Sequence, residues 1–198
     1  MFKFVCFILL GCSFILVNGC ASKAAYIDAG GTDTIVSLNK INIQDWDNAA
    51  NKLVDSLLTS GVIERAKRQP AVLGISRISN RTTQHVDTDN LIKKIRIALN
   101  RTGKVETTTT IGATSEDPLA QQTAEFNAMM GIAEADPTSN TPDYSLSGKL
   151  LEDRARDGST RQITYTFQMT LTDVNTGRAV WEDEVLITKA GKKSSVGW

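Results

Sequence analysis

The chain has 198 residues, and its 22 basic and 22 acidic side chains give a formal net charge of zero. This balance gives no electrostatic case for a nucleic-acid partner, which would favour a basic face. Hydrophobic residues make up 41% of the chain, as in ordinary globular proteins. All three cysteines lie in the first twenty residues, which excludes a cysteine nucleophile or a zinc–cysteine site in the rest of the chain.

The N-terminal segment has the pattern of an export signal. Lys3 precedes an apolar run over residues 4–17, which is shorter than the roughly 20 residues of a membrane-spanning helix. A positive charge before a short apolar core predicts a secretory signal. The run Leu16-Val17-Asn18-Gly19-Cys20 resembles the bacterial lipoprotein signal. We therefore expect residues 1–19 to be removed and Cys20 to carry lipid.

Cleavage before Cys20 sets the compartment and the charge of the mature chain. The alternative signal Leu9-Leu10-Gly11-Cys12 would leave an apolar core of about seven residues, at the short limit for a signal. Loss of Lys3 leaves 21 basic and 22 acidic residues, a formal net charge of −1. Because Ala21 rather than Asp follows the cysteine, the resemblance to lipoproteins implies an outer-membrane anchor that faces the periplasm.

The chain after the signal divides into a tether, a domain and a tail. Residues 20–44 are rich in small residues and predict a flexible tether, which would span roughly 80 Å when fully extended. Residues 45–190 predict one globular domain, and residues 191–198 predict a mobile tail.

The first half of the domain alternates helices and strands. We expect Asp45 or Asp47 to cap a helix that stops at Gly61. Ala71–Ile75 predicts a buried strand, and residues 80–83 predict a polar loop. The apolar side of the first helix, at helical spacing, carries Trp46, Ala50, Leu53, Val54, Leu57 and Leu58.

A second helix carries an apolar stripe from Leu91 to Leu99, with Asp87 or Thr88 as its cap and Gly103 at its end. A short strand over residues 104–109 and a third helix over residues 118–133 follow, the latter with a proline in its first turn.

The remainder of the domain reads as β structure. Residues 144–151 predict a strand, and residues 152–158 a charged hairpin loop. Residues 163–172 alternate strictly between apolar and polar side chains, so this strand covers a core with one face. The turn Asn175-Thr176-Gly177 predicts a hairpin back to a strand at 179–188. The element order predicts an α/β (α+β) fold, with about three helices against a mixed sheet of four or five strands.

Several short motifs occur in an order that resembles the LpoB family of penicillin-binding-protein activators. They cover most of residues 45–188, and the Asn-Arg-Thr run after a strand and the Thr-Gly…Trp hairpin are the most specific. The motifs are Asp45-Trp46, Val72-Leu73, Ser79-Asn80-Arg81-Thr82, Arg96-Ile97-Ala98-Leu99-Asn100, Gly103-Lys104, Tyr144-Ser145-Leu146-Ser147-Gly148 and the hairpin from Leu171 to Trp181.

The resemblance implies a fold like the N-terminal domain of TolB and the secretion lipoprotein CsgG. It implies a lipoprotein that is not an enzyme, is anchored in the outer membrane and activates a bifunctional, class A penicillin-binding protein. The alternative is a CsgG-like structural or assembly lipoprotein of an envelope or secretion complex. Two departures stand out: a short tether without proline before Asp45, and a long charged segment from Glu152.

Candidate partner-binding residues follow from the polar runs. Asn80, Arg81 and Thr82 form one such set, and Arg154 and Arg156 in the charged hairpin form another. On the structural alternative, Asn80 caps a turn and Arg81 pairs with a carboxylate, while the charged hairpin is a solvated turn.

Enzyme chemistry has no support in the sequence. The one histidine, His85, lies between polar residues, and there is no catalytic-triad spacing, metal pattern or phosphate-binding loop. We therefore expect no enzymatic activity, no metal, no small-molecule substrate and no cofactor beyond the lipid on Cys20.

Overall fold

The computed structural model describes residues 25–28, 31, 34–109, 117–131 and 141–192. The chain forms two compact units, residues 1–34 and 35–198. In the first unit, the Gly31 amide donates to the Asp28 carbonyl (3.0 Å) and the Thr34 hydroxyl donates to the Gly31 carbonyl (3.2 Å). The lipidation site predicted at Cys20 lies outside the described residues.

The second unit is built on one five-stranded sheet with the strand order β2-β1-β3-β4-β5. β1 is parallel to both of its neighbours, and the other pairings are antiparallel. The sheet is therefore mixed, as the sequence predicts, and the predicted fold class is confirmed. The strands are β1 (Ala71–Arg81), β2 (Val105–Thr107), β3 (Tyr144–Asp157), β4 (Thr160–Asp173) and β5 (Ala179–Lys192).

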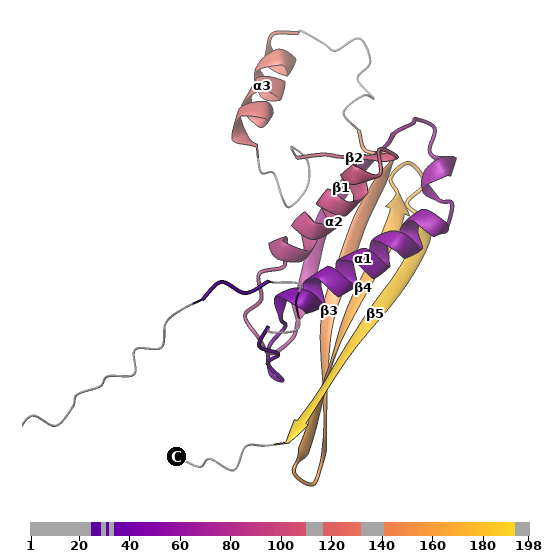
Figure 1. The fold of residues 1–198 in the computed structure, drawn as a ribbon. Coiled ribbons are helices and arrows are strands. Elements are labelled where there is room, and N and C mark those ends of the chain that lie inside the picture. The colour runs from indigo at the N-terminus through magenta and orange to yellow at the C-terminus, as the bar shows by residue number, and fades with distance from the viewer. Residues whose placement is uncertain (1–24, 29–30, 32–33, 110–116, 132–140, 193–198) are drawn as a thin grey trace, which may run out of the picture. The chain divides into compact units, whose positions relative to one another are not determined.

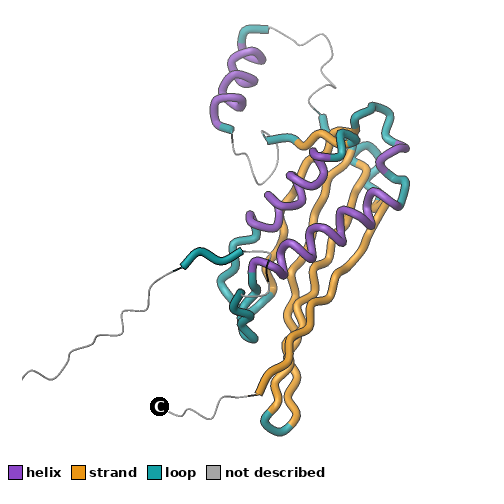
Figure 2. The backbone as a smooth tube through the Cα atoms, in the orientation of Figure 1, coloured by secondary structure: helices purple, strands orange, loops and turns teal. Residues whose placement is uncertain are grey.

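Two helices, α1 (Ile43–Thr59) and α2 (Asp89–Arg101), lie side by side on one face of the sheet (Figures 1 and 2). A single 3-10 turn, η1 (Ile63–Arg65), follows α1. The third helix, α3 (Pro118–Met129), buries none of its residues, so two of the three predicted helices build the core. Proline stands at the start of α3, and Asp117 caps it.

The core lies between these two helices and the apolar face of the sheet. The alternation along β4 is confirmed, because Ile163, Tyr165, Phe167, Met169 and Leu171 are all buried. The predicted apolar side of α1 is buried apart from Leu58, which is half-buried. Trp46 meets the ring of Phe167 edge to face at 5.5 Å between centroids, an arrangement that aromatic pairs favour.

Residue 42, not 45 or 47, caps α1. Asn42 is the N-cap residue, and the Asp45 carboxylate in the first turn accepts a hydrogen bond from the Asn42 backbone amide (2.6 Å). An acidic side chain at this position also interacts favourably with the helix dipole. Packing against the core begins before Asp45, since Leu38 and Ile41 are partly buried against it.

Four of the strands are longer than the sequence predicts, β1 and β3 most of all. β1 continues through Asn80 and Arg81, where a loop is expected, and pairs with β3 as far as Arg81–Leu151. The charged segment 152–157 is paired strand and not loop, and a turn of Gly158 and Ser159 joins β3 to β4. A strand that projects past the helices has no core to cover, so the apolar alternation that identifies strands is missing there.

The C-terminal strand is held to the start of α1 by Lys189. β5 also exceeds its predicted length and ends at Lys192. The Lys189 ammonium donates to the carbonyl of Lys40 (2.9 Å), to Oδ1 of Asn42 (2.6 Å) and to the Asp45 carboxylate. The Lys189 and Asp45 side chains are 8% and 9% exposed. Lys189 also lies 5.8 Å from the centroid of the Tyr165 ring.

Replacing Lys189 with methionine should destabilise the domain strongly. Removal of one partner of a buried ion pair leaves the other charge unpaired and costs about 3–5 kcal/mol. Chemical denaturation measures the change in the free energy of unfolding. The control Lys192→Met alters an exposed lysine of the same strand and should change stability by less than about 0.5 kcal/mol. Equal losses of stability in the two variants would contradict a stabilising ion pair between Lys189 and Asp45.

Candidate functional site

The end of β1 forms a closed polar turn. Oδ1 of Asn80 accepts hydrogen bonds from the backbone amide (2.9 Å) and hydroxyl (2.8 Å) of Thr82. Nδ2 of Asn80 donates to the carbonyl of Gln84 (2.8 Å). The backbone amide of Gln84 in turn donates to the Thr82 hydroxyl (3.2 Å). The side chains of Asn80 and Thr82 thus form their hydrogen bonds within the turn, and they fix the path of the loop that leads to α2.

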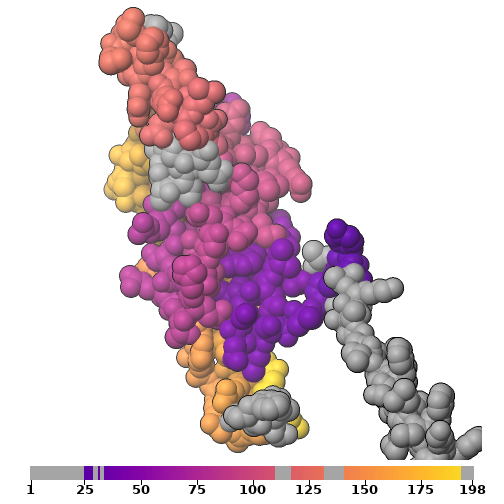
Figure 3. Space-filling model, turned by 90° about the vertical axis from the view of Figure 1, so that its left-hand side faces the viewer, coloured from indigo at the N-terminus to yellow at the C-terminus, as the bar shows by residue number. Residues whose placement is uncertain are grey.

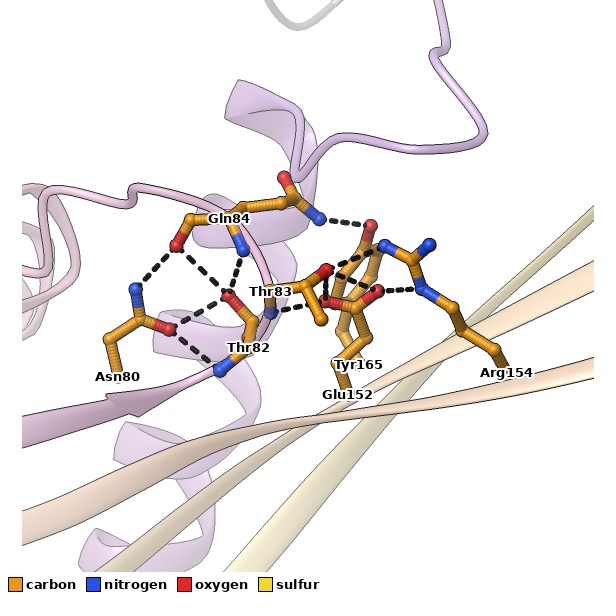
Figure 4. A network of polar contacts seen from close by, with 7 residues as sticks. All are labelled: Asn80, Thr82, Thr83, Gln84, Glu152, Arg154 and Tyr165. Carbon is orange, nitrogen blue, oxygen red and sulfur yellow. Dashed lines mark hydrogen bonds and ion pairs between the residues drawn. The ribbon is translucent and has the colours of Figure 1, made fainter.

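Glu152 joins this loop to β3 (Figure 4). Its carboxylate accepts from the Thr83 backbone amide (3.0 Å) and from the Thr83 hydroxyl (3.1 Å). Nε of Arg154 also donates to the same carboxylate, and an amino nitrogen of Arg154 donates to the Thr83 hydroxyl (2.7 Å). The Glu152 side chain is 2% exposed, whereas that of Arg154 is 52% exposed. The network therefore holds Arg154 in place while leaving much of it open to solvent.

Burial and hydrogen bonding shift the pKa of Glu152 in opposite directions. Burial raises the pKa of its carboxyl group, but the hydrogen bonds from Thr83 and Arg154 outweigh burial and hold the pKa below the ordinary value for glutamate. Hydrogen bonds to the charged form favour ionisation. Glu152 is thus a carboxylate at neutral pH with a structural part in the network.

Gln84 connects the loop to the core. Its side-chain amide donates to the phenol oxygen of Tyr165 (2.6 Å), and the Tyr165 side chain is fully buried. Burial raises the pKa of Tyr165 above its ordinary value, against the opposing effect of the bond from Gln84. The phenol therefore stays neutral and serves as an acceptor for the loop.

The remaining predicted residues lie outside this network. Arg81 is exposed at the end of β1; its backbone pairs with Leu151 of β3, but its side chain has no hydrogen bond or ion pair within the described residues. Arg156 is exposed near the tip of the β3–β4 hairpin, where its Nε donates to the Gly158 carbonyl (3.0 Å). The structure thus brings Asn80 and Thr82 close to Arg154 and leaves Arg81 and Arg156 exposed.

Sequence reasoning missed Thr83, Gln84 and Glu152 as the residues that join the two predicted sets. Arg161 was missed as well; it lies directly opposite Arg156 in the hairpin. A signal for Arg161 was present, because a two-residue turn at Gly158 and Ser159 makes 156 and 161 partners by counting outward. Treating 152–158 as a loop concealed this pairing.

The described residues contain no cluster of metal ligands. No group of three His, Cys, Asp or Glu side chains is placed among them to hold a metal ion. His85 is exposed in the loop beside Gln84 and lines a surface depression of about 480 Å³. None of the described helices has the length and apolar content to cross a bilayer.

Comparison with known proteins decides the family. A family model described as "Peptidoglycan-synthase activator LpoB" matches residues 45–187, well over half of the chain. The protein belongs to the LpoB family. The resemblance predicted from the sequence motifs is therefore confirmed. A comparison with curated proteins gives no match.

Solved structures similar to this chain include two LpoB domains. The LpoB C-terminal domain from Salmonella enterica is 19% identical, with a TM-score of 0.43, and the match covers 72% of this chain and 98% of that chain. The corresponding domain from Escherichia coli gives 19%, a TM-score of 0.42 and the same coverage. The lipoprotein GNA1162 from Neisseria meningitidis is 15% identical, with a TM-score of 0.42, over 63% of this chain and 88% of that chain.

Replacing Glu152 with glutamine tests the network. A folded-state pKa below the unfolded value means that the carboxylate stabilises the fold at neutral pH, and that this contribution is lost as the pH falls. Glu152→Gln should therefore lower the free energy of unfolding at pH 7 by about 1–3 kcal/mol. The difference from the wild type should shrink once the pH falls below 4.5, the ordinary value for glutamate.

Asp153→Asn is the matched control, because Asp153 is an exposed carboxylate on the next residue of the same strand. Denaturant titrations of both variants from pH 7 to pH 3 measure the effect. The loss of unfolding free energy in Glu152→Gln could be independent of pH, or no larger than the loss in Asp153→Asn. Either result would show that the ionised carboxylate does not stabilise the loop.

Proposed function

We propose that this protein is a lipoprotein that binds and activates a bifunctional, class A penicillin-binding protein. The observation that carries the proposal is the family match over residues 45–187, because the family is described as peptidoglycan-synthase activators. Activation here means protein–protein contact that raises the rate of another enzyme. The protein itself would form and break no bond, and it would need no metal, cofactor, nucleic acid or small-molecule substrate.

The anchor is part of the proposal. Lipid on Cys20 would hold the protein in the outer membrane, facing the periplasm, and the following residues would set how far the domain reaches. A tether of this kind raises the local concentration of the domain near its partner. The domain would then contact the synthase only within the reach of the tether.

The described residues supply a surface that suits binding without catalysis. Arg81, Arg154 and Arg156 carry exposed cationic groups near one end of the sheet. Thr83 and Glu152 hold Arg154 by hydrogen bonds and an ion pair. Side chains fixed before binding lose less entropy when a partner docks. We propose these three arginines as contact residues, with Asn80 and Thr82 as the residues that shape the loop beside them.

Reconstitution tests the function. Residues 21–198, which contain the whole of the second compact unit, should bind a purified class A penicillin-binding protein from the same organism and raise its rate of glycan polymerisation from lipid-linked precursor. A monofunctional glycan polymerase in the same assay should show no change, because the proposed partner is the bifunctional enzyme.

The proposal fails if no class A penicillin-binding protein binds and no polymerisation rate changes. Insertion of the full lipoprotein into vesicles as a stable oligomer, in place of binding, would support the CsgG-like assembly role.

A further inference from the structure

The helix-facing side of the β3–β4 hairpin changes from apolar to cationic along its length. Glu152 lies directly opposite Tyr165, Arg154 opposite Ile163, and Arg156 opposite Arg161. Residues two apart on a strand share a face. Arg154, Arg156 and Arg161 therefore continue the face on which Ile163 and Tyr165 are buried. We call these three residues the arginine face.

The arginine face stands beyond the helices. The hairpin projects past the N-terminal ends of α1 and α2 (Figure 1), and in the space-filling view its orange residues extend below the indigo residues of the first helix (Figure 3). On this side of the sheet, apolar residues form the core beneath the helices. Beyond the helices, the same side carries the three arginines.

The charges on the arginine face are only partly compensated. Glu152 is the acidic residue that shares this face of β3, and it pairs with Arg154. By the register, Asp153 and Asp157 lie on the opposite face, across from Thr164 and Thr160. Within the described part of the chain, neither Arg156 nor Arg161 forms an ion pair with a carboxylate. Two like charges directly opposite in a hairpin are destabilising, so the charges of this pair do not stabilise the hairpin.

The space beside the arginine face fits small anionic groups. A surface depression of about 230 Å³ is lined by the arginine face together with Asn39, Ala155, Gln162 and Ile163. This is smaller than the roughly 300–1,000 Å³ of typical small-molecule pockets. Arginine forks bind carboxylates in a bidentate manner, and a depression of this size has room for one or two carboxylate side chains.

We propose that the arginine face docks an acidic patch of aspartate and glutamate side chains on the partner synthase. This inference rests on the proposed function and names the surface and the chemistry of its partner. Charge complementarity favours a folded acidic surface over an extended polyanion. A polyanion that wraps the hairpin would meet Asp153 and Asp157 on its other face, and such ligands gain affinity from many cationic contacts.

One substitution separates docking from folding. Arg161→Glu places a carboxylate directly opposite Arg156 and replaces a like-charge pair with an opposite-charge pair. The hairpin should be as stable as in the wild type or more so. The same change puts a negative charge in the docking surface. We therefore expect an unchanged or higher melting temperature, together with a dissociation constant for the synthase that rises about 30-fold or more.

The double variant Arg156→Glu, Arg161→Glu should lose binding further. Its control is Lys52→Glu, Arg101→Glu, which makes the same change of charge at exposed positions of α1 and α2. The control should bind within about twofold of the wild type, because rim and remote charges act mainly through long-range steering. Binding is measured by biolayer interferometry against the purified class A penicillin-binding protein at two salt concentrations.

The outcomes are distinct. If the wild type binds the synthase and both arginine variants bind equally well, the arginine face is not the docking surface, while the proposed function stands. If the wild type binds no class A penicillin-binding protein, the proposed function and this inference fall together. If the arginine variants lose binding only to phosphatidylglycerol vesicles, tested in parallel, the surface recognises lipid and the inference is overturned.

Discussion

The buried ion pair between Lys189 and Asp45 is the constraint on which the arrangement of this domain depends. It joins the last strand of the sheet to the first turn of α1, and the same ammonium also binds the segment just before that helix. Since α1 covers the core, its position determines how much of the sheet is covered by helix and how much of the hairpin extends uncovered. The exposed end of the hairpin is a consequence of that boundary.

A second set of contacts works at the same boundary. Thr83, in the loop after β1, is bound by Glu152 on β3, and Gln84 is bound by the buried Tyr165 on β4. Elements far apart in sequence are thereby fixed where the hairpin leaves the core. The arginines beyond this point are carried by paired strands and not by a loose loop. A surface held in this way would need little rearrangement if the proposed partner docked on it.

Periodicity made the core predictable and left the hairpin unpredicted. The strict alternation from Ile163 to Leu171 identifies a half-buried strand because each apolar residue covers the core. The segment from Glu152 to Asp157 has no core to cover, so charged residues occur on both faces and the pattern resembles a loop. The cap of α1 escaped prediction for a different reason. Asn42, Asp45 and Asp47 all have capping chemistry, and Lys189, which is 147 residues from Asn42 and 144 from Asp45 in sequence, binds both of them. Long-range contacts of this kind leave no periodic signal.

The claim that the hairpin carries the partner-binding surface is tested most directly by NMR mapping of the isotope-labelled domain, residues 21–198, with unlabelled class A penicillin-binding protein. We expect the largest changes in amide signals on residues 154–163 and on the adjacent loop around Thr83, whereas β2 and the C-terminal end of α2 should stay unchanged. Changes confined to β2, α3 or the outer face of β5, with the hairpin signals unaltered, would contradict it.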